Sequence, residues 1–344
     1  MAIAKVLLDV AVNELNQEKD PLTGPLSKES STPALVEYTT QHPTDMRARL
    51  IHVKRLGRGG QGDVSKVEEI SSGKQFALKA MRFTHWDDPV RDDEERERRE
   101  ALVRDEVEIM QNLRHLHIAT VLFTVRERES FDFIMLPVAD KDLHTFFEEC
   151  STRHYLGTKR ELLPKWMGCL VSALAFAHEQ QIRHKDIKPK NILVKGDQVY
   201  LTDFGIAVDF STADVSYTEG DFQGTRRYQA PENTRGMSHG RAADMFSLGC
   251  VFSEMLTIFK HKSIGDFVQK RRKSYFSEDA YHLTLPAVKR WLLELRGDEL
   301  SDFLVDSILN MLQSEPRLRY KAVELKKVYG ERDAFGCEVC RMGD

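Results

Sequence analysis

Apolar and polar positions divide the chain into an early region of short strand-like runs and a later region of helical periodicity. Strand-like runs such as 75–79 and 131–135 occur between residues 51 and 136, and a charged helical stretch at 92–113 interrupts them. From residue 140 to 330 apolar residues recur mostly every three or four positions, which predicts helices. A small β-rich lobe before a larger α-rich lobe predicts a junction between lobes, which is a favoured place for ligands.

Three elements of the later region can be predicted individually. Residues 166–182 form one expected helix, and residues 244–258 form another that is apolar almost all round and therefore buried. The stretch 191–203 predicts a hairpin, because two apolar runs flank a Gly196-Asp197 turn. The first helix carries apolar residues at helical spacing: Trp166, Leu170, Leu174 and Ala177.

The chain ends differ from this compact region. Residues 1–50 predict an N-terminal extension that contains a linker, because positions 21–43 are rich in Pro, Ser and Thr. Residues 331–344 are polar and short, which is typical of a C-terminal tail. We therefore expect one domain over residues 51–330.

Composition excludes several classes of protein. The 344 residues are 41% hydrophobic and 30% charged, and 50 Lys plus Arg against 54 Asp plus Glu give a net charge of −4. This balance argues against a dedicated nucleic-acid binder, which is usually basic. No run of 18 uncharged apolar residues is present, so we expect no membrane span. Five cysteines are too few and odd in number for a disulfide framework, which favours a cytoplasmic or nuclear compartment.

The first chemical signal is a glycine-rich turn, in which Gly57, Gly59 and Gly62 let the backbone approach phosphate oxygens. An ordinary hairpin turn explains the same glycines, so the signal is weak alone. A Rossmann dinucleotide site is excluded, because Val64 starts a strand-like run where that site needs a helix.

Lys79 is the second signal, because a lysine at the end of an apolar strand can hold phosphates. A single lysine at such a position is normally just solvated. Glu106 on the following helix is the expected partner of Lys79. We prefer it to Glu108, because Glu106 and Met110 share one helix face at i, i+4.

A far more specific pattern follows in His184-Lys-Asp186-Ile-Lys188-Pro-Lys-Asn191, with Asp203-Phe-Gly205 twelve residues after Asn191. Together with the signals above, the chain resembles the eukaryotic protein kinase superfamily over about residues 51–330. Three further matches are Ala230-Pro-Glu232, Asp244-Met-Phe-Ser-Leu-Gly249 and Arg319. The resemblance implies an α+β, bilobal fold: a small β-rich N-lobe (51–136) with one main helix, and a hinge with a larger α-helical C-lobe (137–330).

The resemblance also implies ATP and Mg²⁺ as cofactors and a role for each matching residue. Asp186 would accept the proton of the substrate hydroxyl, and Lys188 would neutralise charge on the γ-phosphate. Lys79, held by Glu106, would bind the α- and β-phosphates. Asn191 and Asp203 would supply oxygen ligands to Mg²⁺, and Thr225 would hydrogen-bond near Asp186 and Lys188.

The same alignment places the adenine site. Met135 would stand at the back of the pocket, and the backbone of Leu136-Pro-Val138 would read the base. An ordinary hydrophobic core explains these apolar residues equally well. The remaining nucleotide-binding residues implied are Leu56, Gly57, Gly59, Gly62, Val64, Ala77 and Leu193, with Val64, Ala77 and Leu193 sandwiching the ring.

Two details favour serine/threonine over tyrosine substrates. Lys188 lies two residues after Asp186, and Gly224-Thr225 precedes Ala230-Pro-Glu232, which are both the serine/threonine pattern. We therefore predict a Mg²⁺-dependent serine/threonine protein kinase that acts on protein substrates, with a regulatory protein partner left open. The alternatives are a nucleotide-binding pseudokinase scaffold and a small-molecule kinase of related fold. The filled catalytic positions argue against the first, and Ala230-Pro-Glu232 with Arg319 argues against the second.

Three features depart from the family pattern or lie outside it. Lys185 replaces the usual Arg, which keeps the positive charge but not the forked guanidinium. One interpretation is that Ser216 or Thr218 is phosphorylated and that Lys185 orders the phosphorylated segment. The alternative is that these hydroxyls belong to an ordinary polar loop. The basic stretch 260–273 is either a solvated loop or a docking site for an acidic partner. Cys337-x-x-Cys340 has the spacing of half a zinc site, but no second such pair is nearby, so we expect no metal there.

Overall fold

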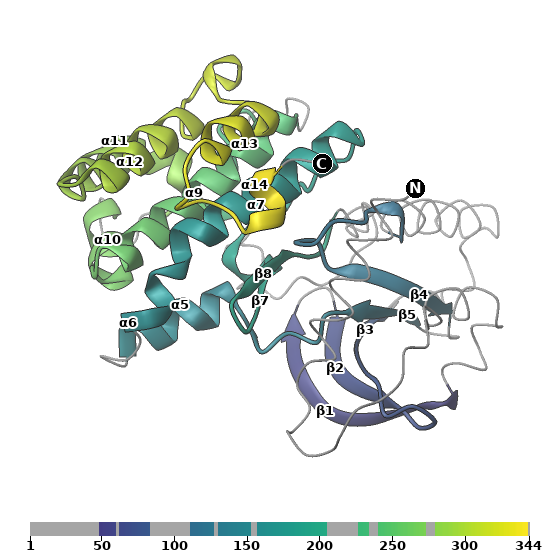
Figure 1. The fold of residues 1–344 in the computed structure, drawn as a ribbon. Helices are drawn as coiled ribbons and strands as arrows, with labels where there is room; N and C mark the ends of the chain where they lie inside the picture. The colour runs from purple at the N-terminus through teal and green to yellow at the C-terminus, as the bar shows by residue number, and fades with distance from the viewer. Residues whose placement is uncertain are drawn as a thin grey trace, which may run out of the picture.

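The computed structural model describes residues 48–59, 62–82, 111–126, 130–152, 157–204, 226–233, 240–272 and 279–342. Within these residues, a β-sheet region precedes a helical region, which confirms the predicted bilobal α+β fold (Figure 1). Of the predicted extension 1–50, residues 1–47 lie outside the described residues, and Leu50 already begins the first strand. The charged helix also lies outside the described residues, except for its last residues from 111 onward.

The small lobe is a five-stranded antiparallel sheet in the order β1-β2-β3-β5-β4. Both predicted strands are present, the first within β3 and the second within β5. One face is apolar because Phe76, Leu78 and Ile134 alternate onto it and are buried together. The strands are β1 (Leu50–Gly59), β2 (Gly62–Glu69), β3 (Gln75–Arg82), β4 (Thr120–Arg126) and β5 (Ser130–Leu136).

The large lobe is built around two buried helices, α7 (Leu162–Glu179) and α9 (Arg241–Phe259). The predicted helix 244–258 lies within α9, and the predicted helix 166–182 corresponds to α7, which ends three residues earlier. By length and composition alone α9 could cross a membrane, but 83% of its apolar window is buried inside the protein, as in the core helix of a globular domain. The surrounding helices are α5 (Leu143–Thr152), α6 (Gly157–Arg160), α10 (Ile264–Arg271), α11 (Tyr281–Glu294), α12 (Glu299–Met311), α13 (Ala322–Gly330) and α14 (Glu338–Met342).

A short sheet lies where the two lobes meet in Figure 1. It has the order β6-β7-β8, and the β7–β8 pair is the hairpin that the sequence predicts. Gly196 occupies the turn with φ +55°, a conformation that favours glycine. The bounds are β6 (Lys141–Asp142), β7 (Ile192–Lys195) and β8 (Gln198–Leu201), and the short helix η1 (Pro189–Asn191) leads into β7.

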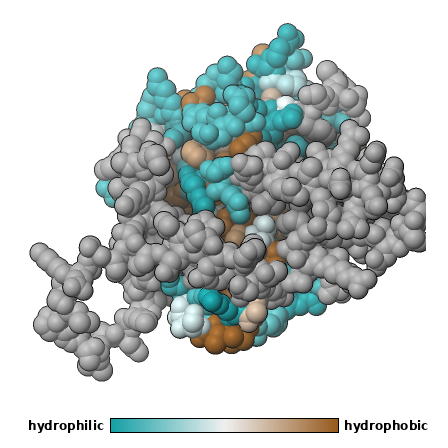
Figure 2. All heavy atoms as spheres, turned by 90° about the vertical axis from the view of Figure 1, so that its right-hand side faces the viewer, coloured by the Kyte–Doolittle hydropathy of each residue, from teal (hydrophilic) through white to brown (hydrophobic). Residues whose placement is uncertain are grey.

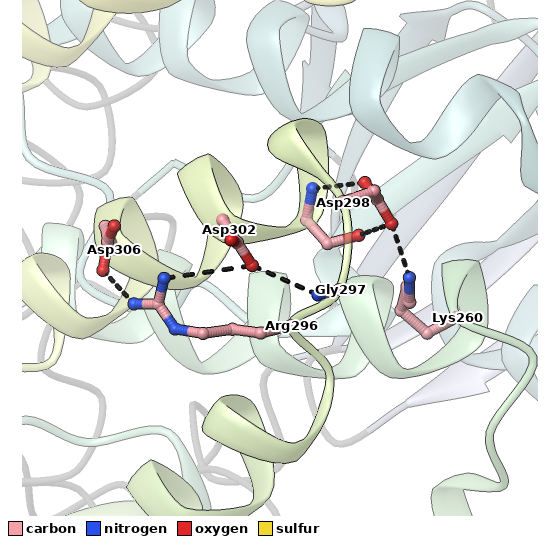
Figure 3. Close-up of polar contacts among 7 residues, drawn as sticks. Lys260, Arg296, Gly297, Asp298, Asp302 and Asp306 are labelled. Carbon is pink, nitrogen blue, oxygen red and sulfur yellow. Dashed lines mark hydrogen bonds and ion pairs between the residues drawn. The ribbon is translucent and has the colours of Figure 1, made fainter.

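A carboxylate cap begins α12 (Figure 3). Asp298 accepts a hydrogen bond from the backbone N–H of Ser301 at 2.8 Å and pairs with Lys260 Nζ at 2.7 Å. Nearby, Arg296 forms ion pairs with Asp302 and Asp306 one turn apart on the same helix (Figure 3). These contacts hold the turn between α11 and α12 against the start of α12.

The basic stretch 260–273 is not simply a solvated loop in its described residues 260–272. Arg271 is buried, and its guanidinium lies 3.9 Å from the centre of the Tyr281 ring. Lys270 pairs with Glu294 at 2.6 Å, and Lys260 pairs with Asp298. Lys270 and Arg271 lie on α10 and contact α11, whereas Lys260 follows α9 and pairs with the residue before α12, so these three cations connect neighbouring elements of the large lobe.

Large exposed apolar side chains on the described part of the small lobe are few. Figure 2 shows a small hydrophobic group at the lower edge of one face, the end at which the small lobe lies in Figure 1. The exposed members of this lobe are Ile51, Val53 and Ile70. Ile51 and Val53 lie two positions apart on β1 and are exposed, whereas Leu50 on the same strand is buried.

Candidate active site

The loop that precedes η1 is held from below by one buried carboxylate. Asp244, in the first turn of α9, accepts hydrogen bonds from the backbone N–H groups of His184 (2.9 Å) and Lys185 (2.8 Å). His178 Nε2 lies 2.9 Å from the same carboxylate. Burial alone would raise the pKa of Asp244, but the hydrogen bonds from His178 and from the loop hold it below its ordinary value. The ionised carboxylate therefore fixes the backbone just before Asp186.

Lys185 itself has φ +67° and an exposed side chain. This sharp bend turns the chain, so Asp186 and Lys188 lie on the side of the loop that faces Asn191. Ser216 and Thr218, the two predicted phosphorylation sites that Lys185 would order, lie outside the described residues.

Asp186, Lys188 and Asn191 converge on one point. Lys188 Nζ lies 2.7 Å from Asp186 Oδ2. Asn191 Nδ2 donates to the same oxygen at 3.0 Å and to the backbone carbonyl of Asp186 at 2.9 Å. Residues two and five positions apart are thus locked into one cluster by side-chain contacts within the loop.

Lys79 and Asp203 join the two lobes. Lys79 lies on β3, where its register partners are Val64 on β2 and Phe133 on β5. Its Nζ lies 2.8 Å from Asp203 Oδ1, and both side chains are mostly buried. The structure therefore brings together two predicted site residues that are 124 positions apart in sequence (203 − 79).

Asp203 stays ionised beside this lysine. Burial alone would raise the pKa of Asp203, but the Lys79 ammonium holds it below its ordinary value. Phe204 packs on the ring of buried His184, with 4.6 Å between ring centres. Phe204 follows Asp203, and His184 lies two residues before Asp186. Their contact therefore helps to fix the position of the Asp203 carboxylate relative to that of Asp186.

The predicted nucleotide-binding residues occupy neighbouring strands of the small lobe and the start of the large lobe. Ala77 pairs in register with Met135, and Val64 pairs with Lys79. Gly57 is opposite Val64, and Gly59 is opposite Gly62, so the glycines form the hairpin between β1 and β2. The hairpin interpretation of the glycines is therefore correct as local structure, and it is compatible with a phosphate-binding loop.

The remaining predicted residues fall at the lobe junction. Leu136 ends β5, and the chain passes through Val138 into β6 of the large lobe. Leu193 lies on β7, opposite Tyr200 on β8, and is partly buried. Leu56 lies on β1, partly buried. Two predicted site residues, Glu106 and Thr225, lie outside the described residues.

A buried ion pair braces the large lobe beneath this site. Arg319 donates to both oxygens of Glu232, at 2.6 and 2.9 Å. The same guanidinium donates to the backbone carbonyls of Gln313 and Ala242. The predicted contact between Arg319 and the Ala230-Pro-Glu232 segment is present.

Sequence reasoning missed the way in which Asp244 works. It identified Asp244 only as part of a matching motif, without His178 as its partner. The available signal was an acidic residue at the start of an otherwise apolar, buried helix, which needs partners to be stable. The loop residues 184 and 185 supply two of these partners.

The arrangement suits a reaction at a hydroxyl group next to phosphates. It presents a carboxylate, Asp186, beside an ammonium group on Lys188. A second carboxylate and ammonium, Asp203 and Lys79, lie at the lobe junction. Carboxylate and amide oxygens are available to a hard cation.

Comparison with known proteins agrees with this geometry. A family model described as a protein kinase domain matches residues 50–329. Cyclin-dependent kinase-like 2 of Pongo abelii is 26% identical over 292 residues, which is 78% of this chain and 55% of that protein. Serine/threonine-protein kinase PrkC of Bacillus subtilis is 28% identical over 281 residues, 78% of this chain and 38% of that protein.

A plant relative is similar over a shorter region. Serine/threonine-protein kinase AtPK1/AtPK6 of Arabidopsis thaliana is 31% identical over 208 residues, 60% of this chain and 41% of that protein. The chain spans about half, or less, of the length of these three relatives. The family match covers most of the chain and includes every element that carries the site. The chain belongs to the protein kinase family.

Proposed function

We propose that this chain is a serine/threonine protein kinase that transfers the γ-phosphoryl group of ATP to Ser or Thr hydroxyls of proteins. The observation that carries the proposal is the cluster in which Lys188 Nζ and Asn191 Nδ2 both contact Asp186 Oδ2. This cluster places a proton acceptor and a positive charge within one hydrogen-bond length of each other. Phosphoryl transfer depends mainly on such positioning and charge neutralisation.

The proton chemistry falls to Asp186. A substrate hydroxyl within hydrogen-bond distance of its carboxylate would be oriented for attack and would give up its proton to that oxygen. Lys188 would remain charged and stabilise negative charge on the phosphoryl oxygens during transfer. The backbone N–H groups of His184 and Lys185 donate to Asp244, which fixes the start of the loop that carries Asp186 and Lys188. The loop therefore needs little rearrangement at the moment of reaction.

The residues present fit Mg²⁺. Asn191 donates through Nδ2 to Asp186, which leaves its carbonyl oxygen as the end of the amide available to a cation. One oxygen of Asp203 pairs with Lys79, and the other is available as a ligand. Mg²⁺ prefers such oxygen ligands and, when bound, would neutralise phosphate charge. Asn191 and Asp203 are the residues that would hold it.

The nucleotide would bind where β3, β5 and β7 approach the lobe junction. Lys79 would hold the α- and β-phosphates in place of its present contact with Asp203. Val64, Ala77 and Leu193 would enclose the adenine ring, and the backbone of residues 136–138 would read its edge. Leu56, Met135 and the β1–β2 glycines would complete this site.

Specificity for Ser or Thr rests on Lys188. Its position two residues after Asp186 follows the serine/threonine pattern, and two of the relatives named above are serine/threonine kinases. The Arg319–Glu232 brace supports a protein substrate, because it stabilises the segment that a bound peptide would contact. The kinase domain we propose covers residues 51–330. A reducing cytoplasmic or nuclear compartment is part of the proposal, because five cysteines are too few and odd in number for a disulfide framework.

The test is transfer of labelled phosphate from Mg²⁺-ATP to a mixed library of Ser, Thr and Tyr peptides and to small hydroxyl compounds. We expect label on Ser or Thr peptides with the wild-type chain. With Asp186→Asn we expect a rate lower by about 10²-fold or more, because the proton acceptor is gone.

The matched control is Asp197→Asn, an exposed aspartate in the β7–β8 turn of the same lobe. We expect this variant to match wild type. Label on tyrosine alone would contradict the specificity, and label on small compounds alone would contradict the substrate class. Equal rates for wild type and Asp186→Asn, with Mg²⁺-ATP still protecting the protein from thermal unfolding, would favour the pseudokinase alternative.

A further inference from the structure

Four side chains of types that bind metal ions meet at α7, although they come from distant parts of the chain. The ligand atoms of His117, Cys169, Cys337 and Cys340 all lie within 4.8 Å of one another. Cys169 lies in the middle of α7, Cys340 lies in α14, Cys337 immediately precedes α14, and His117 lies in the loop before β4. The other two cysteines, Cys150 and Cys250, take no part in the group.

We propose that these four residues bind a structural Zn²⁺ ion. Three thiolates and one imidazole are a common tetrahedral ligand set for structural zinc. Zn–S bonds of about 2.3 Å and a Zn–N bond of about 2.0 Å give a tetrahedron whose ligand atoms lie roughly 3.5–3.8 Å apart. The 3.3 Å between His117 Nε2 and Cys337 Sγ is near this value, and the rest of the group is close enough to reach it by small side-chain rotations.

The histidine is already oriented for this role. His117 Nδ1 lies 2.8 Å from the backbone carbonyl oxygen of Val199, an acceptor that requires the proton on Nδ1. In a neutral, metal-binding ring the unprotonated nitrogen is then Nε2, which is the atom that lies among the three sulfurs. A zinc-bound histidine typically has its other ring nitrogen fixed in this way.

The backbone around the cysteines is shaped to bring them together. The N–H of Cys337 points at Cys169 Sγ at 3.3 Å, and the N–H of Gly336 donates to the carbonyl of Lys165 at 3.0 Å. A Cβ on Gly168 would lie 2.3 Å from the nitrogen of Gly336, so only glycine at position 168 lets the two segments approach. Gly336 has φ +74°, which also favours glycine. Each glycine directly precedes a ligand cysteine.

The site is closed, as a structural site should be. His117, Cys169 and Cys337 are buried, and Cys340 is half-buried. Four protein ligands leave no open coordination position for a substrate. The cluster contains none of the residues assigned to phosphoryl transfer, so the zinc would have a structural role.

This proposal differs from the expectation from the sequence that no metal binds near Cys337 and Cys340. That expectation rested on the absence of a second Cys-x-x-Cys pair. The two further ligands come from one helix and one loop, separated from Cys337 by 168 and 220 residues. No local spacing rule can detect them.

The ion would connect the end of the described chain to the active site. His117 and Ala119 exchange backbone hydrogen bonds with Leu201 on β8, two residues before Asp203. A metal on His117 would therefore stabilise the strand that presents Asp203. The same ion would hold α14 against α7.

The test begins with metal analysis of the full chain, purified under reducing conditions without added chelator. We expect one zinc ion per chain, and we expect the protein to keep this ion when it is passed over a chelating column. Cys169→Ser and Cys337→Ser should lose the ion, whereas Cys150→Ser, another buried cysteine in the same lobe, should retain it. Folding of each variant is checked by circular dichroism.

A second measurement does not depend on how the variants fold. Wild-type chain is stripped of metal under reducing conditions and titrated with Co²⁺. We expect thiolate-to-cobalt charge-transfer bands and the intense visible bands of a tetrahedral site, which Zn²⁺ then abolishes by displacement.

Three outcomes would overturn the proposal. The first is wild-type protein that contains no zinc and gives an octahedral cobalt spectrum. The second is zinc retained in full by both ligand variants. The third is a disulfide among Cys169, Cys337 and Cys340 that persists in reductant and leaves too few thiolates for a metal.

Discussion

The buried pair Arg319–Glu232 gives an asymmetric prediction. The Arg319 side chain is fully buried and that of Glu232 is 9% exposed. Arg319→Met leaves the Glu232 carboxylate buried without its partner, and breaking a buried pair in this way costs about 3–5 kcal/mol. Glu232→Gln leaves the guanidinium with the backbone carbonyls of Gln313 and Ala242 at 2.7 and 2.8 Å. We expect this second change to cost only about 1–2 kcal/mol, since one charged hydrogen-bond acceptor becomes neutral.

The assay is urea unfolding followed by tryptophan fluorescence. With an m-value of about 3 kcal/mol/M, Arg319→Met should lower the midpoint by about 1–1.7 M and Glu232→Gln by less than about 0.7 M. In the double variant, Glu232→Gln should recover part of the loss, because the uncompensated charge is removed.

The matched control is the neighbouring exposed pair Arg317–Glu315, whose side chains are 87% and 50% exposed. Arg317→Met should change stability by less than about 1 kcal/mol. A Glu232→Gln variant as unstable as Arg319→Met would refute the reasoning, because it would show that the remaining carbonyl contacts do not support the arginine.

Three further predictions concern other parts of the large lobe. Asp244→Asn should cost about 1.5–3 kcal/mol at neutral pH, because an amide cannot accept all the hydrogen bonds from His178 and the loop. Since the pKa of Asp244 in the folded protein lies below its ordinary value, this difference in stability is full above the pKa of the unfolded chain and should disappear as the pH falls through the folded pKa. Urea unfolding midpoints measured over a range of pH check this. Asp298→Ala should cost about 1 kcal/mol in thermal unfolding and Asp298→Asn much less, since asparagine also caps a helix. The hydrogen bond from Lys260 lowers the pKa of Asp298 to about 2, so the carboxylate is charged at neutral pH. Equal costs for both variants at neutral pH would therefore show that this charge, rather than capping, stabilises the helix start. Gly168→Ala should destabilise by about 1–3 kcal/mol through its clash with the segment before α14; Gly330→Ala, with nothing within 4 Å, serves as its control and should be neutral or stabilising, and equal effects would contradict the close approach.

Local patterns predicted much of the fold. The hairpin at 191–203 was predictable because its turn and its two apolar runs are adjacent in sequence. The two buried helices were predictable because apolar residues dominate them. The candidate catalytic residues were identified through motifs, and the structure adds the contacts between them, such as the 2.8 Å between Lys79 and Asp203.

What the sequence could not supply depends on distant partners. The basic stretch 260–273 looked solvated, but Arg271 is buried because aromatic rings from α10 and α11 enclose its guanidinium. The segment after residue 330 looked like a polar tail, yet Phe335 and Cys337 are buried against the large lobe. Composition over a dozen residues does not show that Phe335 will pack on rings from α12 and α13, or that Cys337 will lie against Cys169 on α7.

The close packing of the Gly336 segment on α7 has a consequence for synthesis of the chain. The ribosome makes α7 early and residues 335–342 much later; Cys169 and Cys337 are 168 residues apart. At translation rates of about 5–20 residues per second, roughly 8–34 seconds separate the two. During that time the face of α7 around Gly168 and Cys169 has no cover. The nascent large lobe therefore displays an uncovered, thiol-bearing surface, which closes only when α14 emerges.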